Sequence, residues 1–370
     1  MFEDRLRNWA DKRGYRVALA ATLVLDVVRS KLEERRDAGL IDAAFFRENL
    51  AGFRFLDECR IPGPKSLLMV AVPSPVHILS FVYRDRRIEG LIPPTYVNYR
   101  KTFEDVLADM KANALAGEGG PIAIEVLKAP LKSLAVHMGL ASYGRNNITY
   151  VPGLGSGYQL CGYVVGTAAR PAGDQDRTQA GRAAKRDRRA HKFHGVDGRP
   201  GSPHGDWPET VMDRCAKCRA CVVACPTGAI REDRFLISAE RCYTLFSESK
   251  KPVPEWARLP KSMCLIGCLN CQEVCPANRR RLKYEPWGVD FTAEEADAVL
   301  ELGRRLKAGS GSRGTGRGAG RSGRALASAC AKFDRLGMSE DLEVVGRNLL
   351  AILMSPGRAT AGGPRAPRRP

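Results

Sequence analysis

Between residues 215 and 226 the chain reads Cys215-Ala216-Lys217-Cys218-Arg219-Ala220-Cys221-Val222-Val223-Ala224-Cys225-Pro226. This is the C-x2-C-x2-C-x3-C-P run with which bacterial ferredoxins hold [4Fe-4S] clusters. The first three thiolates of such a run reach the irons of one cubane, and the fourth binds the other cluster. Pro226 fixes φ at the turn and removes an unpartnered N–H. The spacing therefore predicts a domain built around two cubanes.

A second segment reads Cys268-Leu269-Asn270-Cys271-Gln272-Glu273-Val274-Cys275-Pro276. It keeps the C-x2-C-x3-C-P ending but has no cysteine three residues before Cys268. We expect the first cubane to be held by three thiolates of the first segment and the last of the second: Cys215, Cys218, Cys221 and Cys275. We expect the second cubane to take Cys225, Cys268, Cys271 and one more thiolate, from either Cys242 or Cys264.

Structural zinc is the alternative, because two C-x2-C pairs can form a four-cysteine site. Eight cysteines would need two such sites, and the paired C-x3-C-P endings have no role in a zinc ribbon. The twelve cysteines of this chain are also not spread as a disulfide framework would be. The sequence therefore predicts iron–sulfur chemistry in a reducing compartment.

The remaining sequence predicts a cytoplasmic protein without a membrane segment. The apolar run 17–25 is short, is flanked by acidic residues and has no cleavage signal. No stretch approaches the roughly 20 apolar residues of a membrane span. The net charge is +18, but most of it lies in weakly patterned stretches, where it supports non-specific binding of polyanions at most.

The chain divides into a mixed α+β arrangement with several parts. Residues 1–60 have helical spacing, whereas Ser66–Val72 and Val76–Tyr83 are strand-like apolar runs. Further along, Thr292 and Glu295 form a capping-box pattern at the start of a helix expected over 291–306. The predicted parts are an α/β cofactor or substrate domain at 1–168, a disordered basic insertion at 169–208, a ferredoxin-like double-cluster domain at 209–290, a helical region at 291–354 containing a Gly/Arg linker at 307–324, and a disordered tail at 355–370.

A glycine-rich stretch at 143–157 stands out in the first of these parts. Such a loop lets the backbone approach a large flat or anionic ligand closely, although an ordinary glycine-rich hairpin would have the same composition. The candidate cofactor-binding residues are Tyr143, Gly144, Arg145, Asn146, Gly155 and Ser156.

The segment 135–146 (AVHMGLASYGRN) and the Gly-Ser turn 153–157 resemble epoxyqueuosine reductase, a corrinoid-dependent tRNA-modification enzyme. The cysteine region is similar too, including a lone cysteine before a tyrosine at Cys242-Tyr243. In that family the lone cysteine binds the second cluster, so the resemblance favours Cys242 over Cys264. The cysteines left over are then expected to be small buried hydrophobic residues: Cys59, Cys161, Cys264 and Cys330.

The resemblance implies a corrinoid-reductase-like N-terminal domain with cobalamin beside a cluster, reduced to Co(I), and a carboxylic acid that protonates the epoxide oxygen. An ungapped count from Ala135 puts Glu125 where the family has its aspartate, and a buried glutamate can act as a general acid. A solvent-facing strand glutamate is the alternative. The family's Gly-Lys is Gly144-Arg145 here, and its C-terminal tRNA-binding helical repeat is not evident.

Two functions follow from this sequence. The first is an iron–sulfur reductase that passes electrons from a low-potential donor, such as ferredoxin or flavodoxin, through two clusters to a cofactor, with tRNA or a corrinoid protein as a partner. The second is an electron carrier or reductive activator without a substrate of its own. His77 and His137 are candidate proton donors, although a lone histidine in an apolar stretch is usually a core residue.

Overall fold

The computed structural model describes residues 2–63, 65–115, 121–167, 211–257, 262–308 and 321–354. The insertion expected at 169–208, the tail at 355–370 and most of the linker at 307–324 lie outside these residues. Within the described ranges, no helix has the length and apolar character needed to cross a bilayer.

The first sheet is antiparallel throughout, with strand order β1-β2-β8-β5. Its two central strands, β2 (Ser66–Pro73) and β8 (Tyr158–Val165), are almost entirely buried. Leu68 and Val70 share one core with α1 (Phe2–Arg13) and α4 (Tyr99–Asn113). On the opposite face, Leu67 and Met69 share a core with α2 (Leu23–Asp37) and α5 (Leu131–His137). Helices therefore cover both faces, which explains why β2 is an unbroken apolar run rather than an alternating one.

The edge strands of this sheet are β1 (Arg16–Ala21) and β5 (Ile124–Val126). The helix expected across residues 16–21 is wrong, because this segment pairs with β2 from Arg16↔Ala71 to Ala21↔Ser66. Gly14, with φ of +70°, ends α1 just before it. Pairing with β2 satisfies the backbone of the segment, and this tertiary contact overrides its alanine-rich helical tendency.

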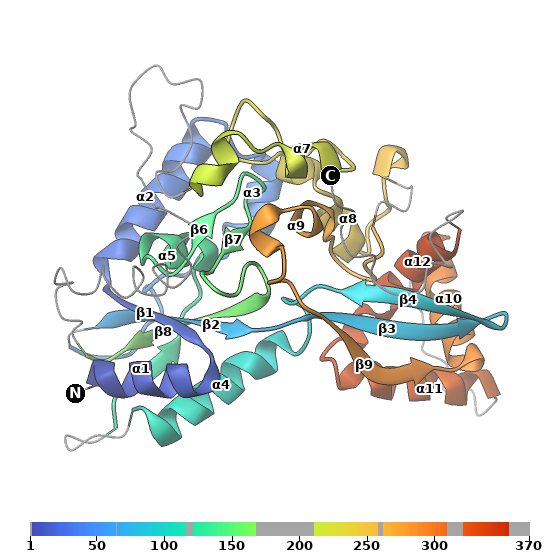
Figure 1. The fold of residues 1–370 in the computed structure, drawn as a ribbon, viewed down its shortest axis with the longest axis horizontal. Helices are drawn as coiled ribbons and strands as arrows, with labels where there is room; N and C mark the ends of the chain where they lie inside the picture. The colour runs from blue at the N-terminus through green and yellow to red at the C-terminus, as the bar shows by residue number, and fades with distance from the viewer. Residues whose placement is uncertain are drawn as a thin grey trace.

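A second sheet has the order β4-β3-β9, with β3 (Val76–Tyr83) and β4 (Arg86–Ile92) forming a hairpin. The strand β9 (Tyr284–Phe291) is parallel to β3 and follows the cysteine region in the chain. Phe81 stacks on Phe291 at 4.5 Å between ring centroids. The hairpin thus leaves the first sheet and pairs with a strand from beyond residue 280, as Figure 1 shows. The predicted boundary at residue 168 stays a prediction.

Three C-terminal helices pack on this second sheet: α10 (Ala293–Lys307), α11 (Arg321–Asp334) and α12 (Leu342–Leu353). The capping box predicted at the start of α10 is confirmed, since Thr292 Oγ1 accepts from Glu295 N and Glu295 Oε2 accepts from Thr292 N. At Gly303 an added Cβ would lie 2.2 Å from the backbone of Gly346, so α10 and α12 cross in close contact.

The cysteine region consists of short helices and turns. It lies between the first sheet with its helices and the second sheet with its helices (Figure 1). Two short strands, β6 (Ser142–Tyr143) and β7 (Thr149–Tyr150), connect it to the first sheet. A further helix, α3 (Ala43–Asn49), lies in the N-terminal half. The remaining elements are η1 (Asp213–Ala216), α7 (Ala220–Ala224), η2 (Ala239–Arg241), α8 (Tyr243–Glu248), η3 (Glu255–Ala257), α9 (Asn270–Glu273), η4 (Pro276–Asn278) and η5 (Ser339–Asp341).

Candidate iron–sulfur centre

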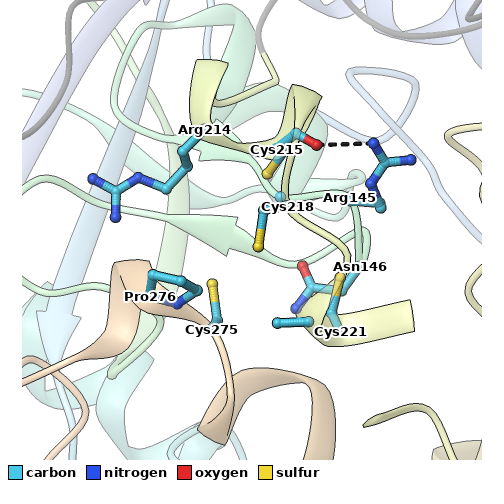
Figure 2. A pocket seen from close by; sticks show the side chains of 10 residues that line it. Arg145, Asn146, Arg214, Cys215, Cys218, Cys221, Cys275 and Pro276 are labelled. Atoms are coloured by element: carbon cyan, nitrogen blue, oxygen red, sulfur yellow. Dashed lines mark hydrogen bonds between the residues drawn. The ribbon is translucent and has the colours of Figure 1, made fainter. Parts of the chain in front are cut away.

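The structure brings four cysteines of the two segments around one cavity. Their side chains face one another in Figure 2. The first three come from η1, the following turn and α7, whereas the fourth comes from the residue before η4. These residues, which we call quartet one, are Cys215, Cys218, Cys221 and Cys275.

Burial makes the thiolate forms of quartet one costly. Burial, followed by the neighbouring thiolates of Cys215 and Cys275, raises the pKa of Cys221 to about 12. Such thiols ionise only when a bound cation offsets this cost, as iron does in a cluster. In the described part of the chain, no three His, Cys, Asp or Glu side chains converge on a point suited to a single ion. Four cysteines around a shared cavity are the ligand set that a [4Fe-4S] cubane needs.

Four further cysteines interact with one another next to quartet one. Burial is the main cause that raises the pKa of Cys268 to about 11, and the thiolates of Cys242 and Cys225 add to it. The pKa of Cys271 lies well above its ordinary value, mainly through burial and then through Cys268. Cys271 also interacts with Cys221, so the two groups are neighbours. We call this second group quartet two: Cys225, Cys242, Cys268 and Cys271.

Cys264, the alternative ligand, lies in a different environment from Cys242. It belongs to a small apolar cluster with Val76, Leu269 and Leu282, and it bridges to Leu91 of β4. Burial raises the pKa of its thiol strongly. Cys264 therefore behaves as a buried hydrophobic residue. Of the other cysteines set aside, Cys161 is buried, whereas Cys59 and Cys330 are only half-buried.

Part of the glycine-rich loop forms the wall of quartet one. Gly144, Arg145 and Asn146 line its cavity. The Arg145 guanidinium is 5% exposed and donates from Nη2 to the carbonyl of Cys215 at 2.8 Å, as Figure 2 shows. It also lowers the pKa of Cys221, against the larger effects of burial and thiolate repulsion. A fixed positive charge thus lies beside thiolates that are costly to ionise.

The other end of the loop docks on the second cysteine segment. Ser156 N donates to Asn278 Oδ1 at 2.8 Å, and Ser156 Oγ donates to Gln272 Oε1 at 2.8 Å. Tyr150 was not anticipated as a site residue, yet its hydroxyl accepts from Asn146 Nδ2 at 2.9 Å, and Cys275 contributes to its raised pKa. Sequence spacing could not reveal Tyr150, Gln272 and Asn278, because their partners are distant in the chain.

The predicted proton donors lie in three separate places. Glu125 is on β5, where its Oε2 accepts from the backbone N of Arg60 at 3.2 Å, and it lines neither of the two cavities described here. His77 packs edge-on against Trp287, and burial lowers its pKa. His137 lines a second cavity, where its Nδ1 is 2.8 Å from the carbonyl oxygen of Ser133.

The residues expected to bind cobalamin do not form an open surface for it. Tyr143, Arg145, Asn146 and Ser156 are all between 4% and 6% exposed, and their contacts are with the cysteine segments or the core. An added Cβ at Gly155 would lie 2.5 Å from Asn278 Oδ1, so this glycine serves a close protein contact. These residues therefore fit a role in holding the clusters and not in binding a corrinoid.

Two groups of four cysteines beside a mixed α/β body are the arrangement expected of a double-cluster iron–sulfur protein. Residues 214–278 match the family described as 4Fe-4S double cluster binding domain, which supports two [4Fe-4S] clusters. The resemblance to epoxyqueuosine reductase is confirmed by curated proteins and by solved structures.

The sequence similarity is confined to part of the chain. Identity is 36% over 91 residues with the epoxyqueuosine reductase of Synechococcus sp. (strain CC9605), covering 22% of this chain and 28% of that protein. It is 39% over 72 residues with that of Escherichia coli (strain K12), covering 19% of each. The matched segment thus spans less than a third of these relatives.

The structural similarity extends over nearly the whole chain. The structure of epoxyqueuosine reductase from Streptococcus thermophilus superposes with a TM-score of 0.62 and 16% identity, covering 95% of this chain and 80% of that one. A complex of epoxyqueuosine reductase with a tRNA stem loop gives a TM-score of 0.52, also at 16% identity, covering 95% of this chain and 99% of that one. The chain thus has an epoxyqueuosine reductase-like fold.

Proposed function

We propose that this protein is an iron–sulfur reductase in which quartet one and quartet two each hold a [4Fe-4S] cluster. The observation that carries the proposal is the position of Cys275, which lines one cavity with Cys215, although the two are sixty residues apart in the chain. A crossed ligand of this kind is the hallmark of two-cluster ferredoxin domains. The chain would then receive electrons from a low-potential ferredoxin or flavodoxin.

The protein's own residues hold the two sites side by side. Bound clusters would accept and release one electron at a time. Cys221 and Cys271 come from different quartets, and their charges interact, so the path between the sites is short. Asn146 donates to the carbonyl of Cys271 at 3.3 Å and lines quartet one, which ties the two sites together.

The candidate substrate is an epoxide on a modified tRNA base, because similar proteins carry the name epoxyqueuosine reductase and one such structure is solved with a tRNA stem loop. Glu125 is the candidate acid for the epoxide oxygen, although it would have to exchange its bond to Arg60 for a substrate contact. Cobalamin remains a candidate acceptor to be tested by titration. A carrier or activator without its own substrate is the alternative.

The test is turnover of an epoxyqueuosine-containing tRNA stem loop by anaerobically reconstituted protein, with and without cobalamin, followed by mass spectrometry. We expect about eight irons and eight sulfides per chain. The variant Cys275→Ser should lose one cluster and the activity, whereas Cys330→Ser, at a half-buried cysteine of α11, should keep both. A protein with both clusters but without turnover would contradict the proposed tRNA substrate and would favour an electron carrier. A protein that contains zinc in place of iron would contradict the cluster assignment itself.

A further inference from the structure

A second cavity, of about 40 Å³, lies between α2 and α5, and the proposed electron path does not use it. This volume has room for a few water-sized groups, which is about the size of a phosphate group and not of a whole nucleotide. Among the described residues that line the cavity, none is acidic and two are strong cations. The described residues that line it are Val28, Lys31, Leu32, Arg35, Pro130, Ser133, His137 and Tyr143.

The two cations, Lys31 and Arg35, lie four residues apart on α2 and so occupy the same face of that helix. Both are half-buried, and like charges at this spacing repel each other. Among the described residues, no carboxylate lies within ion-pair distance of either one. By contrast, the neighbouring Arg36 pairs with Asp37 at 2.7 Å. A pair of cations that the described residues leave without a counter-charge is suited to an anion.

Two hydroxyl groups complete the polar side of this cavity. Ser133 Oγ and the Tyr143 hydroxyl are 2.9 Å apart, so one of them can donate to a ligand while accepting from the other. The Tyr143 ring is fixed edge-on against Phe235 at 5.1 Å between centroids. Burial raises the pKa of Tyr143, which keeps the phenol neutral and able to donate. The hydroxyls are therefore preorganised on a rigid wall.

The same cavity also has an apolar wall, which is formed by Val28, Leu32 and Pro130. A bare inorganic ion would leave that wall unused, whereas the organic part of a ligand would cover it. Arginine and lysine together match the three acceptor oxygens of a phosphate group, with arginine able to bind two of them at once.

We propose that this cavity is a binding site for a phosphate group carried by an organic ligand, held by Lys31, Arg35 and the Ser133–Tyr143 hydroxyl pair. The source is either a free mononucleotide or the backbone of a single-stranded RNA, since both present the same phosphate chemistry. The site does not depend on cluster chemistry. Tyr143, which lines this cavity, directly precedes Gly144, which lines the cavity of quartet one.

The test is calorimetric titration of the cluster-loaded protein at about 150 mM salt, which screens loose surface attraction. The probes are inorganic phosphate, AMP and a short oligoribonucleotide. We expect Arg35→Gln and Lys31→Gln to weaken binding at least tenfold, with Arg35→Lys retaining most of it. Lys111→Gln, which removes an exposed positive charge on α4, is the matched control and should bind as the unaltered protein does.

The outcomes separate the two sources. Binding of AMP with the expected response to Arg35→Gln supports a mononucleotide, and binding of the oligoribonucleotide alone with the same response supports an RNA backbone. The proposal is overturned if none of the three probes binds, or if both glutamine variants bind as tightly as Lys111→Gln. Cluster absorbance is recorded in each titration, and if a glutamine variant does not fold, Ser133→Ala provides the second variant and should also weaken binding.

Discussion

Ser156 and Asn278 hold each other at two points, although they are 122 residues apart: Ser156 N donates to Asn278 Oδ1 at 2.8 Å, and Asn278 Nδ2 donates to Ser156 Oγ at 2.8 Å. Both residues are buried. Asn278 also donates to the carbonyl of Gln272 at 2.8 Å. These two hydrogen bonds, which we call the clamp, hold the glycine-rich loop against the segment that carries Cys271 and Cys275.

The close approach of this clamp predicts a specific sensitivity at Gly155. The substitution Gly155→Ala combines a left-handed backbone, at φ +62°, with a Cβ 2.5 Å from Asn278 Oδ1. Gly228→Ala is a matched control, since its φ is +65° and nothing lies within 4 Å of the added atom. We expect about 1–2 kcal/mol of destabilisation at Gly228 from the backbone alone and a clearly larger loss at Gly155. Urea titration followed by cluster absorbance measures both, and equal losses would contradict the clamp.

The buried charge of Arg145 predicts an effect on one cluster only. Reduction adds negative charge, which a neighbouring guanidinium stabilises. Replacing it in Arg145→Gln should therefore lower the reduction potential of the cluster in quartet one, by on the order of 60 mV for a tenfold change in a one-electron equilibrium. Potentiometric titration followed by electron paramagnetic resonance resolves the two clusters. The exposed Arg47→Gln should shift neither, and an equal shift of both clusters in Arg145→Gln would count against this assignment.

The different surroundings of Cys242 and Cys264 predict opposite results for the same substitution. Cys242→Ala removes a member of quartet two, so we expect the iron content to fall to about half after reconstitution. Cys264→Ala removes a buried apolar sulfur, so we expect all the iron to remain with a stability loss of about 1 kcal/mol. Iron and sulfide analysis distinguishes the two cysteines; retention of all eight irons in Cys242→Ala would show that another residue is the ligand.

The pair Glu295–Lys332 predicts a pH-dependent contribution to stability. Hydrogen bonds from Lys332 and Ser328 outweigh burial and hold the Glu295 pKa below its ordinary value of 4.5. The stabilisation is therefore present above that value and is lost as pH falls through the lower pKa of the folded state. Lys332→Met leaves a buried carboxylate unpaired, so we expect a loss of about 3 kcal/mol near neutral pH.

This loss should shrink as pH falls toward 4, because protonation of Glu295 removes the unpaired charge. Urea unfolding followed by the fluorescence of Trp287, which packs on the same core, measures it. Lys250→Met breaks the pair with Glu343, in which the lysine is 58% exposed, and should change little. A difference between Lys332→Met and the unaltered protein that does not vary with pH would contradict the account.

The elements that the sequence predicted correctly are those whose sequence pattern acts over a few neighbouring residues. The strand Val76–Tyr83 and the capping box at Thr292 were predicted correctly because apolar runs and caps act over a few residues. The strand β1 was missed because its pairing with β2 decides its conformation, and the strand β9 was not expected because its partner β3 lies about two hundred residues earlier.

The cysteine spacing by itself determined the kind of chemistry, because a cubane accepts thiolates only at a few intervals along the chain. Only the tertiary structure decided what surrounds those thiolates. It placed Arg145 beside quartet one, buried Cys264 in an apolar cluster and brought Lys31 and Arg35 together at one cavity. The physical reason is that charge and burial depend on distances in space, and residues far apart in the sequence set those distances.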